Sequence, residues 1–374
     1  MLWLQGQWSP LDAEAIGRQA HNFAMQGVDD EAESGYQAAL AANPFAAAAW
    51  VARAELAETT GDDERALDML TLARRLEPHT LRTEWALANT YLRGGSHDQA
   101  ARHFGPLAAS IPEMRVGIVD AAWSGGISPS DIAKTIVPPQ GQAAGEFLNY
   151  LVRKKAWADL APAYAAFDEP LKRSIPIKLM RYTFDQAFAA SETQVYLDLW
   201  KQSPDAVDHA HSLLSIEHAG PPEAFGLGGY GLHWAVRLRR GVATQAGTSD
   251  GDPTSIEITF TEPQNLHYSH VARDFPVDPS RRYVLHAEVQ AEEVTSSQGV
   301  RLVVIAPSGS LVESWPIRGT SDWSRVKLAF RPGPSDRVLR LSVARYPSET
   351  FDRDITGRFR LRNVRIVGPR GNLP

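Results

Sequence analysis

The sequence predicts an α-helical solenoid followed by an antiparallel β-sandwich, two architectures that bury apolar residues with different periods. Two observations indicate this multidomain fold class. Prolines at positions 44, 78 and 112 recur every 34 residues in the first third of the chain. From about His218 onward, short alternating runs of apolar and polar residues are separated by turn residues, which is typical of an all-β domain. A chain of 374 residues is long enough for two or three domains of ~100–200 residues each.

Other positions recur in register with the three prolines. A glycine, an alanine and a bulky side chain precede each proline at constant distances, and a second alanine recurs earlier in each unit. Each unit therefore predicts two amphipathic helices joined by a glycine-containing turn, the second helix ending before a proline that lacks an N–H donor. One such pair cannot bury its apolar face alone, so we expect the pairs to stack. The recurring positions are Gly27, Gly61 and Gly95; Ala32, Ala66 and Ala100; Tyr36, Leu70 and Phe104; and Ala20, Ala54 and Ala88.

These positions resemble the tetratricopeptide repeat, over three units from about residue 13 to residue 114. The resemblance implies that the first helix of each unit lines a concave groove that binds a protein partner. The repeated Lys/Asn pattern that clamps a terminal carboxylate is missing, so a C-terminal peptide is not the expected ligand. By transfer from the repeat, the expected groove residues are His21, Met25, Val51, Glu55, Trp85, Asn89 and Arg93.

The middle of the chain continues as helix without the 34-residue period. Residues 145–167 and 179–202 have the apolar spacing of helical hairpins, and Pro138-Pro139 marks a break before them. We expect degenerate repeats or a helical extension that caps the solenoid. The predicted domains are 1–114, three tetratricopeptide-like repeats; 115–217, the helical extension; and 218–374, the sandwich.

A glycine-rich segment near the start of the β region has the spacing G-x-G-x-x-G at Gly226, Gly228 and Gly231. That spacing cradles a pyrophosphate only where a strand precedes it and a helix follows it. Here "GPPEA" precedes it, and the alternating "LHWAVRLRR" follows it. We therefore expect a linker and the entry to a strand, and no nucleotide site.

Eight alternating runs between residues 233 and 368 predict eight strands of an antiparallel sandwich. The stretches "NLHYSHVARDFPVDPSRRYVLHAEVQAEEV", "GTSDWSRVKLAFRPG" and "ARYPSETFDRDITGRFRLRNVRIV" resemble the jelly-roll carbohydrate-binding modules of bacterial glycan enzymes. Helical repeats followed by such a module are similar to a group of bacterial envelope proteins associated with exopolysaccharide and O-antigen gene clusters. The resemblance implies a periplasmic or envelope-associated protein; it identifies neither the glycan nor the protein partner.

Modules of this kind bind sugars by stacking a pyranose ring on Trp or Tyr, while polar neighbours bond to the hydroxyls. Trp315, flanked by Glu313, Ser314 and Pro316, is the ring least like a core residue. Trp234 is expected in the core or at an edge, and Trp323 in the core. The candidate glycan-binding residues implied by the resemblance are Trp234, His267, Tyr268, Trp315, Arg345 and Tyr346.

No cofactor is expected, and a structural calcium stays open. His267 and His270 stand three residues apart on a predicted strand, so they point to opposite faces, and no third ligand with a suitable spacing is visible. The last strand of the resembled modules often carries an Asp-Asp pair where Arg362-Asn363 stands here, so structural calcium is not expected there. Acidic residues that remain available as oxygen ligands elsewhere are Asp250, Asp252 and Glu262.

Composition narrows the classes of partner. Hydrophobic residues make up 43% and charged residues 22% of the chain, as in folded soluble proteins. The net charge of −6 and the lack of basic runs argue against nucleic acid. There is no cysteine, hence no disulfide, thiolate metal site or cysteine nucleophile. No apolar stretch approaches the ~18 residues of a membrane span, and we expect no signal peptide at the start of this sequence; whether a membrane anchor preceded it stays open.

The sequence lacks the motif H-E-x-x-H and the lysine of a P-loop. We therefore expect a non-catalytic adaptor of envelope polysaccharide production or export, in which the solenoid binds a protein and the sandwich binds a glycan. Two alternatives stay open. In the first, the sandwich is only a scaffold or a protein-contact surface. In the second, the chain is a polysaccharide-modifying enzyme, since the catalytic carboxylates of such enzymes have no fixed spacing in the sequence.

Overall fold

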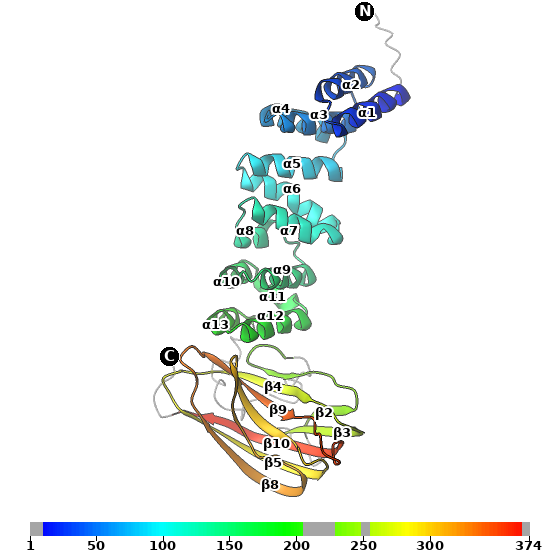
Figure 1. Cartoon of the computed structure of the whole chain (residues 1–374). Helices are drawn as coiled ribbons and strands as arrows, with labels where there is room; N and C mark the ends of the chain where they lie inside the picture. The colour runs from blue at the N-terminus through cyan, green and yellow to red at the C-terminus, as the bar shows by residue number, and fades with distance from the viewer. Residues whose placement is uncertain (1–9, 205–228, 248–254, 369–374) are drawn as a thin grey trace, which may run out of the picture. The chain divides into compact units, whose positions relative to one another are not determined.

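The computed structural model describes residues 10–204, 229–247 and 255–368. The chain forms two compact units, Met1–Pro139 and Gln140–Pro374, so their boundary lies inside the stretch 115–217. The first unit is helical. The second contains further helices and the β-sandwich (Figure 1). The predicted fold class, an α-solenoid followed by an antiparallel sandwich, is confirmed. No helix among the described residues is both long and apolar enough to span a membrane.

Antiparallel helix pairs build the first unit, with α1 packed on α2, α3 on α4 and α5 on α6. A short 3-10 turn and two more helices follow the third pair. The elements are α1 (Pro10–Met25), α2 (Asp29–Ala42), α3 (Ala47–Thr59), α4 (Asp63–Leu76), α5 (Leu81–Arg93), α6 (His97–Ser110), η1 (Pro112–Met114), α7 (Arg115–Ser124) and α8 (Pro129–Thr135).

The recurring residues explain the pairs. Gly27, Gly61 and Gly95 have φ of 74°, 79° and 70°, and an added Cβ at any of them would meet nothing within 4 Å. Glycine is therefore favoured there by the left-handed backbone and not by lack of space. The recurring alanines are buried at the helix contacts, as predicted, and the bulky Tyr36, Leu70 and Phe104 are buried as well. Each proline of the 34-residue period stands two positions beyond the end of a helix.

The described part of the second unit begins with five helices, and the two predicted hairpins correspond to α9 with α10 and to α12 with α13. In α9 the apolar face is broad, with Phe147, Leu148 and Leu151 buried. Gly145 lies so close to Leu179 of α12 that an added Cβ would stand 2.6 Å from its Cδ1. The helices are α9 (Gly141–Arg153), α10 (Trp157–Ala165), α11 (Glu169–Ser174), α12 (Ile177–Ala189) and α13 (Thr193–Lys201).

In the described residues the sandwich has two five-stranded sheets, ordered β1-β4-β9-β6-β7 and β2-β3-β10-β5-β8, and neighbouring strands pair antiparallel. The strands are β1 (Trp234–Val236), β2 (Val242–Ala246), β3 (Ile256–Gln264), β4 (Tyr268–Pro276), β5 (Tyr283–Val294), β6 (Arg301–Ala306), β7 (Gly309–Glu313), β8 (Gly319–Phe330), β9 (Val338–Arg345) and β10 (Ile355–Val367).

The eight predicted runs therefore miss two strands, β2 and β7. Both are short edge strands. Since an edge strand is paired on one side only and is half exposed, five residues such as "VATQA" and "GSLVE" show little alternation. The run predicted as one long strand over 233–241 contains only the short β1.

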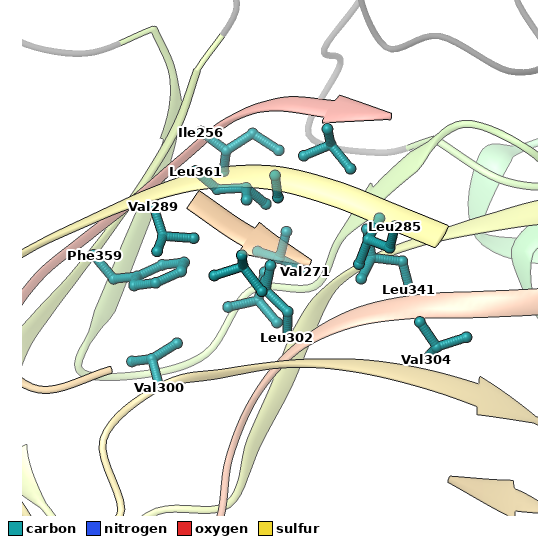
Figure 2. Packing of buried hydrophobic residues seen from close by; sticks show 14 of the residues in the cluster. Ile256, Val271, Leu285, Val289, Val300, Leu302, Val304, Leu341, Phe359 and Leu361 are labelled. Atoms are coloured by element: carbon teal, nitrogen blue, oxygen red, sulfur yellow. The ribbon is translucent and has the colours of Figure 1, made fainter. Parts of the chain in front are cut away.

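The sandwich core lies between the sheets and follows the period-two alternation of the strands (Figure 2). In β5, Leu285 and Val289 point inward, and the polar residues between them point outward. Phe359 and Leu361 of β10 meet them from the neighbouring strand, and Leu302 of β6 comes from the opposite sheet. Burial of these side chains is the main stabilising contribution to the sandwich.

Helices α12 and α13 cover part of the outer face of the sheet β1-β4-β9-β6-β7. The guanidinium of Arg340 on β9 lies 4.5 Å from the ring centre of Phe188 on α12. Tyr196 of α13 is fully buried and bonds to Asp274 of β4. Among the described residues, hydrogen bonds from these two helices to strands β4 and β9 gather around Asp274 and Arg340.

Candidate functional site

The seven predicted groove residues of the solenoid differ in exposure. His21 and Met25 are exposed, and Met25 retains 76% of its accessible surface. Val51 is 2% exposed and belongs to the core between the second and third repeats. The expectation that Val51 lines the groove is therefore corrected: its side chain packs against the next helix pair instead of facing a partner.

The other predicted groove residues already contact neighbours in the solenoid. The Arg82 Nε lies 3.0 Å from Glu55 Oε1, and Asn89 donates its side-chain amide to the Trp85 carbonyl at 2.8 Å. Trp85 meets Phe104 edge-on, with 5.6 Å between ring centres. Arg93 is paired with Glu58. Part of each of these side chains stays accessible, so a partner would meet a surface that is held in place by bonds between repeats.

Charged contacts between repeats are the feature that sequence reasoning missed. Glu33 of α2 accepts both Nε and Nη2 of Arg53 on α3, and its Oε1 lies 2.8 Å from Arg65 Nη2 on α4. The hydrogen bonds from Arg53 hold the pKa of Glu33 below its usual value. Glu84 of α5 accepts a hydrogen bond of 3.0 Å from Arg74 Nε of α4, and within its own repeat it lies 2.6 Å from His103 of α6. The only signal in the sequence was the presence of opposite charges on successive helices, as for Glu33 with Arg53 and Arg65, which lie 20 and 32 residues further on.

In the sandwich, three of the six candidate glycan residues lie in the core. Trp234 is 6% exposed, and Tyr268 and Arg345 are fully buried. Tyr268 meets Phe260 edge-on, and burial raises the pKa of its hydroxyl to about 12. All three belong to the inward-facing set of their strands, so they are not available as sugar contacts. This corrects the assignment of Tyr268 and Arg345, whereas for Trp234 the core was one of the two positions expected.

The hydrogen bonds of Arg345 give it a structural role. Its Nη1 donates to the Leu266 carbonyl at 2.6 Å and to Asn265 Oδ1 at 2.9 Å. Its Nη2 donates to Ser296 Oγ at 3.2 Å and to the Arg353 carbonyl. Since these acceptors come from separate loops, the guanidinium ties the loops at one end of the sandwich together, and burial lowers its pKa.

The other three candidates are surface residues at the end of the sheet β1-β4-β9-β6-β7 where β4 begins and β7 and β9 end. The rings of His267 and Tyr346 lie 6.1 Å apart. The Tyr346 hydroxyl donates to Glu313 Oε2 at 3.1 Å, and Arg301 pairs with Glu313 Oε1 at 2.9 Å while its guanidinium lies over the Tyr346 ring. Burial, and then the hydrogen bond to Glu313, raise the pKa of Tyr346. We call the residues His267, Arg301, Glu313, Trp315 and Tyr346 the Trp315 surface.

Trp315 is 61% exposed, yet its backbone is held on both sides. The Ser314 N–H donates to the Leu302 carbonyl at 2.9 Å, and the Ser314 hydroxyl accepts the Leu302 N–H at 3.1 Å. Two residues beyond the tryptophan, Ile317 and Val300 exchange backbone hydrogen bonds of 2.8 and 2.9 Å. Ser314 is buried, and Glu313 and Trp315 on either side of it are exposed, so burial alternates here as it does along a strand.

The remaining predictions have simpler outcomes. Trp323 is half-buried on the outer face of β8, where the Arg362 guanidinium lies 4.0 Å from its ring centre, so the core position expected for it is corrected. Asp250, Asp252, Gly226 and Gly228 lie outside the described residues. Glu262 lies 3.9 Å from Arg240, and within the described part of the chain no group of three or more acidic or histidine side chains is arranged to hold a metal.

Comparisons with known proteins give likenesses of fold. No family model matches the sequence, and no curated protein matches it. A solved structure described as "CBM4 structure and function" is 12% identical, covering 37% of this chain and 88% of its own, with a TM-score of 0.29. PilF of Pseudomonas aeruginosa is 15% identical, covering 54% and 96%, with a TM-score of 0.32. YrrB, described as a TPR protein with an unusual peptide-binding site, is 13% identical, covering 53% and 89%, with a TM-score of 0.24.

Proposed function

We propose that this chain is a non-catalytic binding protein that holds a glycan on the Trp315 surface and a protein partner in the groove of its solenoid. One observation carries the glycan part of the proposal: a large aromatic ring, 61% exposed, stands on a backbone that hydrogen bonds hold on both sides. An exposed tryptophan costs solvation free energy, and a ring of this kind is well suited to cover the apolar face of a sugar.

The neighbours of Trp315 supply the polar part of such a site. Glu313 is an acceptor, Tyr346 and His267 are donors or acceptors, and Arg301 is a donor. A pyranose stacked on the indole would place its hydroxyls near these groups, since Glu313 and Trp315 are the exposed residues on either side of the buried Ser314. Because hydrogen bonds already hold the backbone around Trp315, binding a ligand would cost less conformational entropy.

A binding role also fits the carboxylate content of the Trp315 surface. Glycoside hydrolysis ordinarily uses a pair of carboxylates about 5–9.5 Å apart. Among the described residues that define this surface there is a single carboxylate, Glu313, and Arg301 and Tyr346 already bond to it. This supports a ligand-holding role over hydrolysis.

The proposed protein partner would contact the exposed side chains His21, Met25 and Arg93 together with the accessible edge of Trp85. In this proposal the protein acts in the bacterial envelope, at a step of polysaccharide production or export. That setting rests on the sequence resemblance to envelope proteins of polysaccharide gene clusters.

A glycan-array screen followed by calorimetric titration of the full chain tests the proposal. Trp315→Ala is expected to weaken glycan binding by about tenfold or more, as loss of a central aromatic contact does, with an unchanged melting temperature. Phe45→Ala is the matched control, because it removes another exposed aromatic ring (64%) from the first unit. Binding of the same strength in Trp315→Ala would overturn the assignment of the site.

One observation favours a second candidate, a sandwich that acts only as a scaffold. Helices α12 and α13 bury Tyr196 and Phe188 against one sheet of the sandwich, so that sheet face already has a structural role. An array on which the wild-type chain binds no glycan at all would support this alternative.

A further inference from the structure

A groove of about 390 Å³ lies on the outer face of the sheet β2-β3-β10-β5-β8, the sheet opposite to the one that carries the Trp315 surface. Strands β8, β5 and β10 form its floor. Its charged and polar side chains are His286, Glu288, Arg325, Lys327, Asn363 and Arg365.

Strand register brings these residues together. His286 of β5 is paired with Lys327 of β8 on one side and with Arg365 of β10 on the other. Glu288 is paired in the same way with Arg325 and Arg362. Paired residues in an antiparallel sheet point to the same face, so two rows of polar side chains run across three strands.

A bulge in β10 shapes the groove. The register shifts between Arg362 and Arg365, and Asn363 lies in the left-handed region with φ of 50°. Asparagine tolerates this conformation better than most residues. The extra residue turns the Asn363 amide towards β5, where its Nδ2 donates to Glu288 Oε2 at 2.9 Å.

The groove has an excess of positive charge. Its lining includes three cationic side chains, Arg325, Lys327 and Arg365, and one carboxylate, Glu288, in a chain whose net charge is −6. Glu288 is shared by three neighbours: it is bound by Asn363 and by Arg362 Nε at 3.0 Å, and it lies 3.7 Å from Arg325 Nε. These hydrogen bonds, that of Asn363 first, keep the Glu288 pKa below its usual value.

Elsewhere on this sheet face, arginines have carboxylate partners of their own. Arg360 Nε lies 2.7 Å from Glu257 Oε2, and its Nη1 donates to Gln290 at 2.9 Å. Arg358 pairs with Glu292 at 3.0 Å. Cations gathered on neighbouring strands repel one another, so the accumulation in the groove has a cost that an anionic ligand would offset.

We propose that this groove binds an acidic saccharide, a sugar whose ring carries a carboxylate. Lys327 and Arg325 would meet the carboxylate, while Asn363 and Glu288 would bond to the hydroxyls. Sugar hydroxyls both donate and accept hydrogen bonds, which suits a lining that contains amide, imidazole and carboxylate groups. The volume lies in the range of small-molecule sites. Among the described residues that line the groove there is no Trp, Tyr or Phe on which the bases of a nucleic acid would stack.

The test is titration of the full chain with trigalacturonic acid, its methyl ester and a neutral galactose trisaccharide at low salt. Only the acid is expected to bind, and raising the salt from about 20 to about 200 mM should weaken it, because exposed charges are screened. A sulfated disaccharide distinguishes a carboxylate-selective groove from a general anion site. Equal binding of the ester, or no binding of the acid, would overturn the proposal.

Substitutions test whether the acidic saccharide binds in the groove. The double variant Arg325→Gln and Lys327→Gln is expected to weaken binding of the acid by about tenfold or more. The control Arg240→Gln removes a side chain of the same sandwich that is 92% exposed and should change nothing. Trp315→Ala should also leave binding of the acid unchanged. If Trp315→Ala abolished it and the groove variant did not, the groove assignment would fall while the proposed glycan site at Trp315 would stand.

Discussion

Arg340 holds the carboxylate of Asp274 by two bonds: Nε lies 2.6 Å from Oδ1, and Nη2 lies 2.8 Å from Oδ2. The Tyr196 hydroxyl donates to the same carboxylate at 2.9 Å, and Arg340 Nη2 also reaches Asp185 Oδ1 at 2.9 Å. Two helices and two strands therefore share one buried charge network. Burial and the neighbouring Asp274 raise the pKa of Tyr196 well above its usual value, so the hydroxyl keeps its proton and serves as a donor.

Replacing Arg340 is expected to be costly. Arg340→Ala would leave Asp274, which is 4% exposed, with a buried charge and no cation, a change that typically costs ~3–5 kcal/mol of folding free energy. Chemical denaturation of the full chain measures the loss. Arg240→Ala, an exposed arginine of the same sandwich, is the control. Equal stability of the two variants would show that the network contributes nothing.

Glu33 makes the solenoid sensitive to acid. Its pKa is lowered in the folded chain, first by the hydrogen bonds from Arg53, so the unfolded state binds a proton more readily. The stabilisation is therefore present above the unfolded pKa of ~4.3 and is lost as the pH falls through the lower folded value. Glu33→Gln should destabilise the chain by about 1–2 kcal/mol at pH 7 and by clearly less near pH 3. Thermal unfolding at both values measures this, and a pH-independent difference would contradict it.

Overpacking tests the repeat register. Ala66 and Ala100 are fully buried where two helices meet, so changing either to Leu should cost ~1–3 kcal/mol. Ala48→Leu, at an exposed position of α3, is the matched control and should be nearly neutral. Melting temperatures that stay unchanged in both buried variants would argue against the helix packing described above.

Tyr268 and Trp315 should behave in opposite ways. Tyr268→Ala removes a fully buried ring and is expected to cost ~3–5 kcal/mol of stability. Tyr268→Phe should be mild, since the hydroxyl has a long 3.4 Å contact with Thr244. Trp315→Ala should leave the melting temperature unchanged and reduce glycan binding. A large loss of stability in Trp315→Ala would instead mean that its ring packs against the sandwich.

The sequence by itself determined the features that depend on local geometry. A turn or a helix contact within one repeat requires each of the recurring residues: Pro44 and its equivalents, the glycines with positive φ, and the small Ala66 and Ala100. Because every repeat has the same requirement, these residues recur at a constant spacing in the sequence. Alternation in β5 and β10 likewise marks strands with one buried face. For this reason the solenoid, the sandwich and most of the strands could be predicted.

Only the tertiary structure decided which side of each strand is buried and which side chains meet. Alternation gives two faces, but the second sheet makes one of them the core, so Tyr268 and Arg345 became interior and Trp315 stayed outside. The contact of Glu33 with Arg53 depends on repeat stacking. The meeting of Lys327, His286 and Arg365 depends on the register of three strands and on a bulge in β10. These are long-range pairings, and no single segment of the sequence contains the information that specifies them.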